Sequence, residues 1–306
     1  MVNWFCASQV RRFMLVLAAG MSSFLWLPAM ASAVPTAEDA VEEAHPEEMS
    51  VDEISRQLEN PLSTLWSLTL QENYTVLEGD ALDGSEWKNT LFFQPAFPIS
   101  WGADKDKVFI ARPVFPHVSG PDFSNPSGND DFERESGLGD IQLLALAGPN
   151  TLDGIVWGLG ATFKFPTASD DALGQGKYQA GPAAMVLNIG ENWTTGLVLQ
   201  HWWSYAGDSH RASTSQTDFQ YILRRSIPGG WSIGMGPTVS IDWKAESGER
   251  VTLPIALGIT KTVKLGGVPV KMRLEPQYTI VKPDDLAATW NVRFQFTPVI
   301  ANPLAR

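Results

Sequence analysis

The chain has 306 residues and a formal net charge of −12, with 22 Lys and Arg residues against 34 Asp and Glu residues. This acidic balance disfavours a nucleic-acid-binding function, which needs an excess of positive charge to meet the phosphates. Cys6 is the only cysteine, so the sequence also excludes a small secreted domain held together by disulfides.

The N-terminus has the pattern of an export signal. Arg11 and Arg12 precede an apolar stretch over residues 13–30, and Ala-Ser-Ala follows at residues 31–33. This order of basic, apolar and small residues predicts a cleavable signal peptide over residues 1–33. A retained membrane helix is the alternative, which the Gly, Ser and Pro residues of the stretch disfavour.

The next segment, residues 34–62, holds nine acidic side chains and one basic one. Such a composition is typical of a solvated segment, so we predict an acidic, partly disordered periplasmic leader. The alternative for residues 51–65 is a short amphipathic helix that touches the mouth of the following domain.

The rest of the chain alternates between apolar and polar residues, which indicates β-strands. Twelve strands are expected, near residues 66–77, 88–99, 107–116, 137–147, 154–165, 176–188, 193–205, 216–225, 230–244, 250–262, 268–281 and 289–297. Several are about twice the usual length of a strand in a globular protein. The even number and the length predict an all-β fold, a transmembrane antiparallel up-and-down β-barrel over residues 63–297, with a C-terminal tail over 298–306.

The spacing of the aromatic residues and the lengths of the connections support this prediction. Trp231 and Trp243 lie on one face of a strand at a separation that spans roughly 30 Å along the membrane normal. Together with Trp290 and Phe296 they are expected at the membrane interfaces. The connections after odd strands are generally longer than those after even strands, as expected when the former face outside and the N-terminus is periplasmic. We therefore expect a bacterial outer-membrane location.

Several sequence words resemble one known family. They are Asn-Pro-Leu-Ser at 60–63, Gly-Leu-Gly-Asp-Ile at 137–141, Phe-Pro-Thr-Ala-Ser-Asp-Asp-Ala-Leu-Gly at 165–174 and His-Trp-Trp-Ser at 201–204. The chain resembles the putative MetA-pathway of phenol degradation family of outer-membrane proteins. The resemblance implies an outer-membrane barrel and a transporter-like function for small or aromatic compounds. The acidic leader lies outside it.

Charged residues occur on the strand faces opposite the apolar ones. A charge that faces lipid at mid-membrane costs about 2–4 kcal/mol for Arg or Lys, so these side chains should point into the lumen. The candidates for lining the lumen are Asp140, Lys164, Asp242, Lys271, Arg273, Glu275 and Arg293. They form either a selectivity patch in a narrow pore or salt bridges that fill and brace the lumen.

Other candidate sites are weaker. Asp170 and Asp171 are oxygen donors in a loop, and a solvated acidic loop explains them better than a divalent cation does. The long connection over 117–136 either folds inward as a constriction or covers the mouth.

Some barrels are lipid hydrolases, for which the candidate pairs are His201 with Ser204 and His117 with Ser119. Residues 201 and 204 point to opposite faces of a strand, and no oxyanion-forming motif accompanies either pair.

The sequence thus predicts an outer-membrane channel for passive passage of small, hydrophobic or aromatic molecules. The alternatives are a structural or surface-binding barrel without transport and, third, an outer-membrane lipid hydrolase. We expect no enzyme activity, no catalytic residue, no cofactor and no nucleic-acid partner. The expected partners are outer-membrane lipid, lipopolysaccharide and the barrel-assembly machinery, which would read the aromatic final strand.

Overall fold

The computed structural model of the chain describes residues 49–60, 62–126 and 132–300. The predicted signal peptide, most of the leader and the last residues of the tail lie outside these ranges. The described residues form one antiparallel sheet, one short α-helix and one turn of 3-10 helix. Among the described helices, none reaches the length and apolarity that crossing a membrane requires.

The sheet closes on itself into a barrel. Its strands are β1 (Trp66–Glu78), β2 (Ser85–Trp101), β3 (Lys107–Pro126), β4 (Phe132–Leu138), β5 (Ile141–Pro149), β6 (Gly154–Phe165), β7 (Lys177–Ile189), β8 (Trp193–Gly207), β9 (Ser215–Ile227), β10 (Trp231–Met235), β11 (Thr238–Asp242), β12 (Val251–Ala256), β13 (Gly258–Leu265), β14 (Val268–Val281) and β15 (Ala287–Ile300). The first strand pairs with both β2 and β15, so the sheet has no free edge.

Three of the barrel strands are each interrupted once. The fifteen strand segments therefore form twelve barrel strands, as predicted. The pairs β4 with β5, β10 with β11, and β12 with β13 each continue one line of chain along the barrel wall. Between β10 and β11 lie Gly236 and Pro237, and proline has no N–H for the strand ladder. The prediction of a closed twelve-stranded antiparallel barrel is confirmed.

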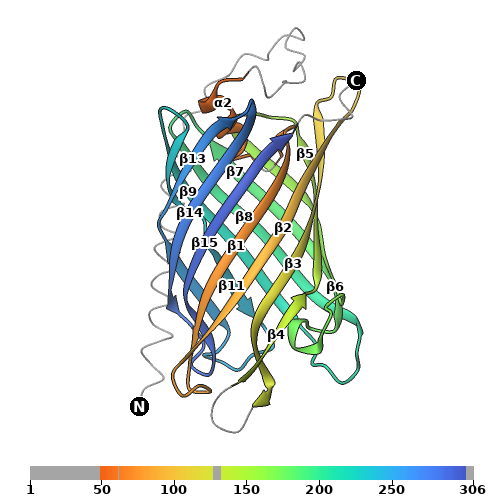
Figure 1. Cartoon of the computed structure of the whole chain (residues 1–306). Coiled ribbons are helices and arrows are strands. Elements are labelled where there is room, and N and C mark those ends of the chain that lie inside the picture. Colours follow the sequence, from red (N-terminus) through yellow and green to blue (C-terminus); the bar gives the residue numbers. More distant parts are fainter. Residues whose placement is uncertain (1–48, 61, 127–131, 301–306) are drawn as a thin grey trace.

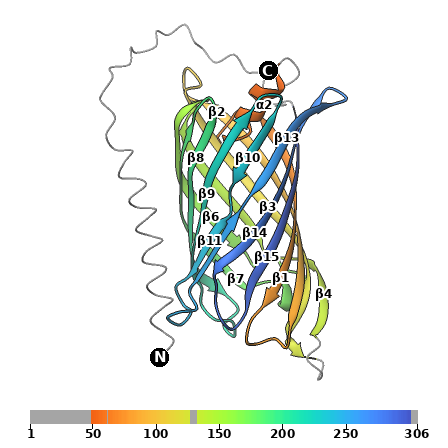
Figure 2. The same ribbon diagram turned by 90° about the vertical axis from the view of Figure 1, so that its left-hand side faces the viewer.

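The two ends of the barrel differ, as Figures 1 and 2 show. The short-turn end carries the turns 102–106, 150–153, 190–192, 228–230 and 266–267, together with the start of β1 and the end of β15. The long-loop end carries the other connections, including residues 166–176 with the 3-10 helix η1 (Asp171–Leu173). The tight turn at Gly266 and Gly267 has positive φ at both residues, 57° and 89°, which glycine adopts without strain.

Two predicted boundaries are wrong. Much of the connection predicted over 117–136 is strand, because β3 continues to Pro126 and pairs with β4. Proline, glycine and asparagine interrupt the sequence period there, although cross-strand contacts such as that of Phe123 with Phe132 still form. The last strand extends to Ile300, which pairs with Trp66, so the tail begins later than residue 298.

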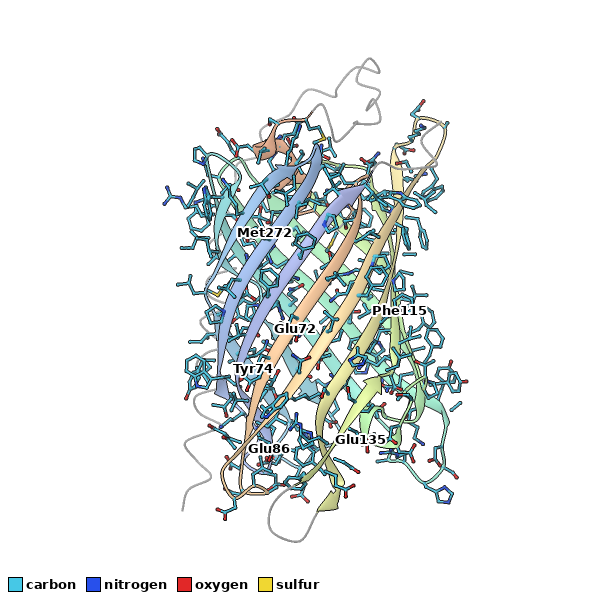
Figure 3. The ribbon with its side chains drawn as sticks, in the orientation of Figure 1. Glu72, Tyr74, Glu86, Phe115, Glu135 and Met272 are labelled. Carbon is cyan, nitrogen blue, oxygen red and sulfur yellow. The ribbon has the colours of Figure 1, made fainter. Side chains whose placement is uncertain are left out.

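The outer wall is apolar, as expected of a surface that faces lipid. Tyr74, Phe115 and Met272 lie on this wall in Figure 3. Trp231 lies at the short-turn end of the wall and Trp243 directly follows β11 at the long-loop end, and both indoles are exposed. This places them at opposite ends, as the sequence predicts. Trp290 also faces outward near the long-loop end, whereas Phe296 is half-buried between Leu70 and Met272.

The leader enters the barrel at the short-turn end. Helix α2 (Val51–Gln57) lies across this end in Figure 1, and the chain then passes inside before β1 begins. Ser50 caps the helix by accepting a hydrogen bond from the Glu53 backbone N–H at 3.2 Å. Ile54 is fully buried in a cluster that includes Val299 of β15. The short-helix alternative for residues 51–65 therefore holds for residues 51–57, which are the helical ones.

Candidate functional site: the barrel lumen

The lumen at the short-turn end has an apolar wall. Strands β3, β5, β6, β7, β8 and β9 each direct aliphatic side chains inward, and these side chains form one buried cluster. Its members on the barrel are Val108, Ile110, Leu144, Leu146, Val156, Ala183, Met185, Leu187, Ile189, Val198 and Ile222. Leu62 of the leader completes the cluster and is only 1% exposed. The leader therefore covers an inner surface that is otherwise open to the lumen.

The opposite wall, on β14 and β15, is charged. Glu275 accepts hydrogen bonds from Arg273 Nε at 3.0 Å and from Arg293 Nη1 at 3.2 Å. Gln277 donates a further hydrogen bond to the same carboxylate at 2.9 Å. Arg273 Nη2 and Arg293 Nη1 also donate to the backbone carbonyls of Gly234 and Gly236, both at 3.0 Å. This buried network braces the wall, because each charge has a partner of opposite sign and further hydrogen bonds.

A second ion-pair cluster joins the charged wall to the leader. Lys271 Nζ donates to Glu59 Oε1 at 2.6 Å and to the Leu58 carbonyl at 3.2 Å, and Arg224 forms an ion pair with the other Glu59 oxygen. Burial by itself raises the pKa of the Glu59 carboxyl, but the charges of Arg224 and Lys271 outweigh burial and lower that pKa far below its ordinary range. Glu59 is thus ionised at physiological pH.

Further hydrogen bonds fasten the leader to the turns of the short-turn end. Asp52 accepts from the backbone N–H groups of Gly229 and Gly230. Asn60 donates to the Thr151 carbonyl at 2.9 Å and accepts from the Leu62 N–H at 2.9 Å. We call the described residues of 49–65 the plug segment, because they fill the lumen between the two walls.

The other half of the lumen, toward the long-loop end, is more polar and contains a cavity of about 330 Å³. Lys164 and Lys88 line it, and the Lys164 ammonium lies 4.0 Å from the centre of the Trp202 ring. The loop over residues 166–176, which we call the roof loop, closes one side of the cavity. Asp140 holds this loop by accepting hydrogen bonds from the backbone N–H groups of Ala168 and Gln175 at 3.3 and 2.7 Å.

The structure brings together only part of the predicted lumen set. Lys271, Arg273, Glu275 and Arg293 lie close together on the inner wall, whereas Lys164 lines the distant cavity. Asp140 lines the same cavity, but its carboxylate holds the roof loop.

Asp242 is exposed at the end of β11 and accepts a hydrogen bond from the Lys244 N–H. Its partner across the sheet is Gln216, which shares the inward face of β9 with Ile222, so Asp242 lies at the rim of the lumen and its role there stays a prediction.

The weaker candidates, the two loop carboxylates considered for a divalent cation, lie in the roof loop. Asp170 caps η1 through the Ala172 N–H at 2.8 Å, and Asp171 is exposed. Within the described ranges, no three His, Cys, Asp or Glu side chains are arranged to hold a metal ion.

The two histidine–serine pairs considered for lipid hydrolysis differ in how their side chains lie. His201 faces outward and contacts Thr217 Oγ1 at 2.6 Å, whereas Ser204 bonds to Thr214, so these two residues do not form a pair. His117 and Ser119 alternate with Val118, which points inward, and therefore share the outer face of β3.

Sequence reasoning missed several side chains that lie in the lumen. Glu59 was assigned to the solvated leader, although its position among apolar residues over 54–65 was an available signal. Arg224, Arg112 and Lys88 occupy inward strand positions but were not selected.

Glu72 differs from these inward-facing residues, because it faces outward and accepts a hydrogen bond from Asn89 on the lipid-facing wall. It is visible there in Figure 3.

Comparison with known proteins supports the fold. No family model matches the chain, and no curated protein matches it. Among solved structures, the COG4313 outer membrane channel from Pseudomonas putida F1 is 17% identical, with a TM-score of 0.58 over 78% of this chain and 96% of that one. The described barrel thus has the fold of an outer-membrane β-barrel.

Two other solved structures are more distant. The beta domain of the Bordetella autotransporter BrkA is 11% identical, with a TM-score of 0.42 over 76% of this chain and 99% of that one. Outer membrane phospholipase A from Escherichia coli is 14% identical, with a TM-score of 0.37 over 81% of this chain and 98% of that one. These scores are too low to carry an argument about function.

Proposed function

We propose that the protein is an outer-membrane channel for passive passage of small molecules and that the plug segment closes it in the conformation described here. The observation that carries this proposal is the way in which the lumen is closed. At the short-turn end a leader segment fills the lumen through side-chain contacts, and the barrel walls behind it have surfaces of opposite character. A segment that is attached at one end of β1 can leave the lumen without unfolding the barrel.

In this proposal the short-turn end is periplasmic, because outer-membrane barrels have short periplasmic turns and longer outside loops. The chain would reach the membrane by means of the predicted signal peptide. Lipid would contact the apolar wall, lipopolysaccharide the outer leaflet half, and the barrel-assembly machinery the aromatic strand β15.

The proposed solutes are small molecules that have both an apolar and a polar part. The apolar wall offers aliphatic contacts, and the charged wall offers guanidinium and ammonium groups. A solute that passes between the walls can replace the contacts that Leu62 and Glu59 make with them. The family resemblance, which names aromatic compounds, supports the same class.

A disulfide that locks the plug segment tests the proposal. A Cβ atom built on Gly158 lies 3.0 Å from Leu62 Cδ1, so cysteines introduced at residues 62 and 158 face each other. Gel mobility with and without reductant shows whether the disulfide, which requires a suitable distance between the two Cβ atoms, has formed. The only natural cysteine, Cys6, lies in the predicted signal peptide. We expect Leu62→Cys with Gly158→Cys to give no conductance steps in planar bilayers when oxidised, and to recover steps when a reductant is added.

Each single cysteine variant under the same oxidant is the matched control and should conduct equally before and after reduction. Equal conductance of the oxidised and reduced double variant would mean that solutes do not pass the plug segment. Absence of conductance and of liposome flux in every variant would favour the alternative of a structural or surface-binding barrel.

A second candidate function, lipid hydrolysis, rests on one group of residues on the outer wall. Ser119 lies directly opposite Asn89 in the sheet, and His117 lies two residues away on the same face. Asn89 donates to Glu72, so serine, histidine, amide and carboxylate share one lipid-facing patch. Because nucleophile, base and orienting group are the parts of a hydrolytic relay, phospholipid release that is lost in Ser119→Ala but kept in Ser136→Ala would favour this candidate over the channel.

A further inference from the structure

The cavity under the roof loop, which the loop closes on one side, has two lysine side chains in its lining. Lys164 is 8% exposed, and its ammonium contacts the face of Trp202 but has no hydrogen-bond or ion-pair partner among the described residues. Lys88, on the neighbouring wall, also has no such partner within the described part of the chain. The carboxylates of Asp140 and Asp218 act on Lys164 only through space. Because removing an ammonium from water without a direct ion-pair partner costs free energy, an anion that enters the cavity would offset that cost.

The carboxylates near this cavity already have other hydrogen-bond donors. Asp140 accepts from two backbone N–H groups of the roof loop. Asp218, whose charge also reaches Lys164, accepts from Gln216 Nε2 at 2.8 Å and from Ser240 Oγ at 2.7 Å. Neither carboxylate forms an ion pair with a lysine of the cavity, so both ammonium groups remain available to a ligand.

The rest of the lining is mixed, with an apolar part beside polar side chains. Phe92, Val118 and Leu173 contribute apolar surface, and Gln142, which lies opposite Lys164 in the sheet, contributes an amide. A volume of about 330 Å³ lies at the lower end of the range for small-molecule sites. It suits a single-ring compound.

We propose that this cavity is a binding site for a small aromatic carboxylate, with the carboxylate between Lys88 and Lys164 and the ring against Phe92, Val118 and Leu173. The inference deepens the proposed function, and the role of the site in solute capture rests on that function. Located at the end that we assign to the outside, the site receives solute before the plug segment is reached. The two lysines select for negative charge, whereas the apolar lining selects for the ring.

The test is equilibrium binding of three single-ring probes to the folded full-length mature protein in detergent, measured by calorimetry. Benzoate carries the anion, benzyl alcohol is neutral and benzylammonium carries the opposite charge. We expect benzoate to bind at least tenfold more tightly than benzyl alcohol, as charge-assisted hydrogen bonds are stronger than neutral ones, and benzylammonium not to bind.

Substitutions identify the site. Lys164→Gln and Lys88→Gln should each weaken benzoate binding about tenfold and leave benzyl alcohol binding unchanged. Lys164→Arg, which keeps the charge, should retain most of the affinity. Lys244→Gln is the matched control, because Lys244 is an exposed lysine in another loop at the same end. Gel mobility before and after heating establishes that each variant is folded.

The outcomes separate this inference from the proposed function. Benzoate binding that is absent from the wild type, or equal in Lys164→Gln, Lys88→Gln and Lys244→Gln, overturns the cavity site even if the protein conducts. Benzoate binding that depends on both lysines in a protein without conductance supports the site and removes the channel.

Discussion

The apolar wall and the charged wall of the lumen contact the same plug segment through side chains only three residues apart. Leu62 packs into the aliphatic cluster of β3 and β5–β9, whereas Glu59 forms ion pairs with Arg224 and Lys271. The apolar contact is non-directional and persists at any pH, since it depends on area removed from water. The ionic contact depends on the charge of one carboxylate, and loss of that charge leaves two buried cations unpaired.

The charged wall itself contains a second carboxylate, Glu275, that serves the barrel and not the plug segment. It joins β14 to β15 through Arg293 and is fully buried. The same substitution, Glu→Gln, at Glu59 and at Glu275 therefore separates what the charged wall contributes to holding the plug segment from what it contributes to the barrel.

The largest effect is expected for Glu275→Gln. The change leaves Arg273 and Arg293 without a counter-charge in the barrel wall, and breaking a buried ion pair in this way costs about 3–5 kcal/mol. Urea unfolding of the barrel in lipid vesicles, followed by gel mobility, measures the loss. Glu246→Gln, at an exposed loop residue, is the control, and an equal free energy of unfolding for both variants would contradict the bracing role.

Glu59→Gln should have the next largest effect, located in the plug segment. Release of the segment should become easier by roughly 3 kcal/mol, with the free energy of barrel unfolding changed much less. Hydrogen exchange of residues 58–65 and the open probability in planar bilayers measure this release. Glu53→Gln, on the exposed face of α2, should behave like the wild type. Unchanged exchange in Glu59→Gln would mean that the ion pairs do not hold the plug segment.

The pH dependence of release follows from the lowered pKa of Glu59. A depressed folded-state pKa gives a contribution to closure that is complete above the ordinary glutamate pKa of about 4.3 and is lost as pH falls toward the lower folded-state pKa. We therefore expect wild-type hydrogen exchange over 58–65 to be flat from pH 7 to 5 and to rise in stronger acid, after correction for intrinsic exchange. In Glu59→Gln this rise should be absent, and a rise of the same size in that variant would assign it to another group.

Leu62→Ala tests the apolar wall. Truncation removes the contact with the aliphatic cluster and should ease release of the plug segment by about 2 kcal/mol. Unlike the Glu59→Gln effect, this change should be equal at every pH. Leu65→Ala, in the smaller cluster around Ile54, compares a leucine outside the apolar wall. An effect of Leu62→Ala that appears only above pH 5 would mean that the apolar contact of Leu62 depends on the ionic contact of Glu59.

The smallest effect is expected on the outer wall. Glu72 faces lipid with Asn89 as its partner, and Glu72→Gln keeps a hydrogen bond while removing a charge. We expect the barrel to become no more than about 1 kcal/mol more stable in vesicles, with no change in detergent. A loss of stability comparable to that of Glu275→Gln would mean that the carboxylate braces the outer wall.

The fold could be predicted because a strand that separates lipid from lumen must alternate at every residue. This constraint gave the twelve strands, the outward Trp231 and Trp243, and the inward Lys271, Arg273, Glu275 and Arg293. It failed at 117–136 and after residue 297, where the strands leave the alternating pattern but continue to pair. Asp242 lies at the rim and not deep in the lumen for a related reason, because a period in the sequence does not reveal the residue at which a strand ends.

The sequence by itself determined which residues face inward on each strand. Only the tertiary structure decided which inward residues meet, because strands distant in the sequence share a lumen and the lumen admits a segment from outside the sheet. Glu59, in an acidic leader of which it is one carboxylate among nine, has two cations as neighbours only after closure of the barrel. Lys164 and Lys88 face one cavity only because the roof loop covers it, and such packing depends on three-dimensional contacts that a two-residue period does not encode.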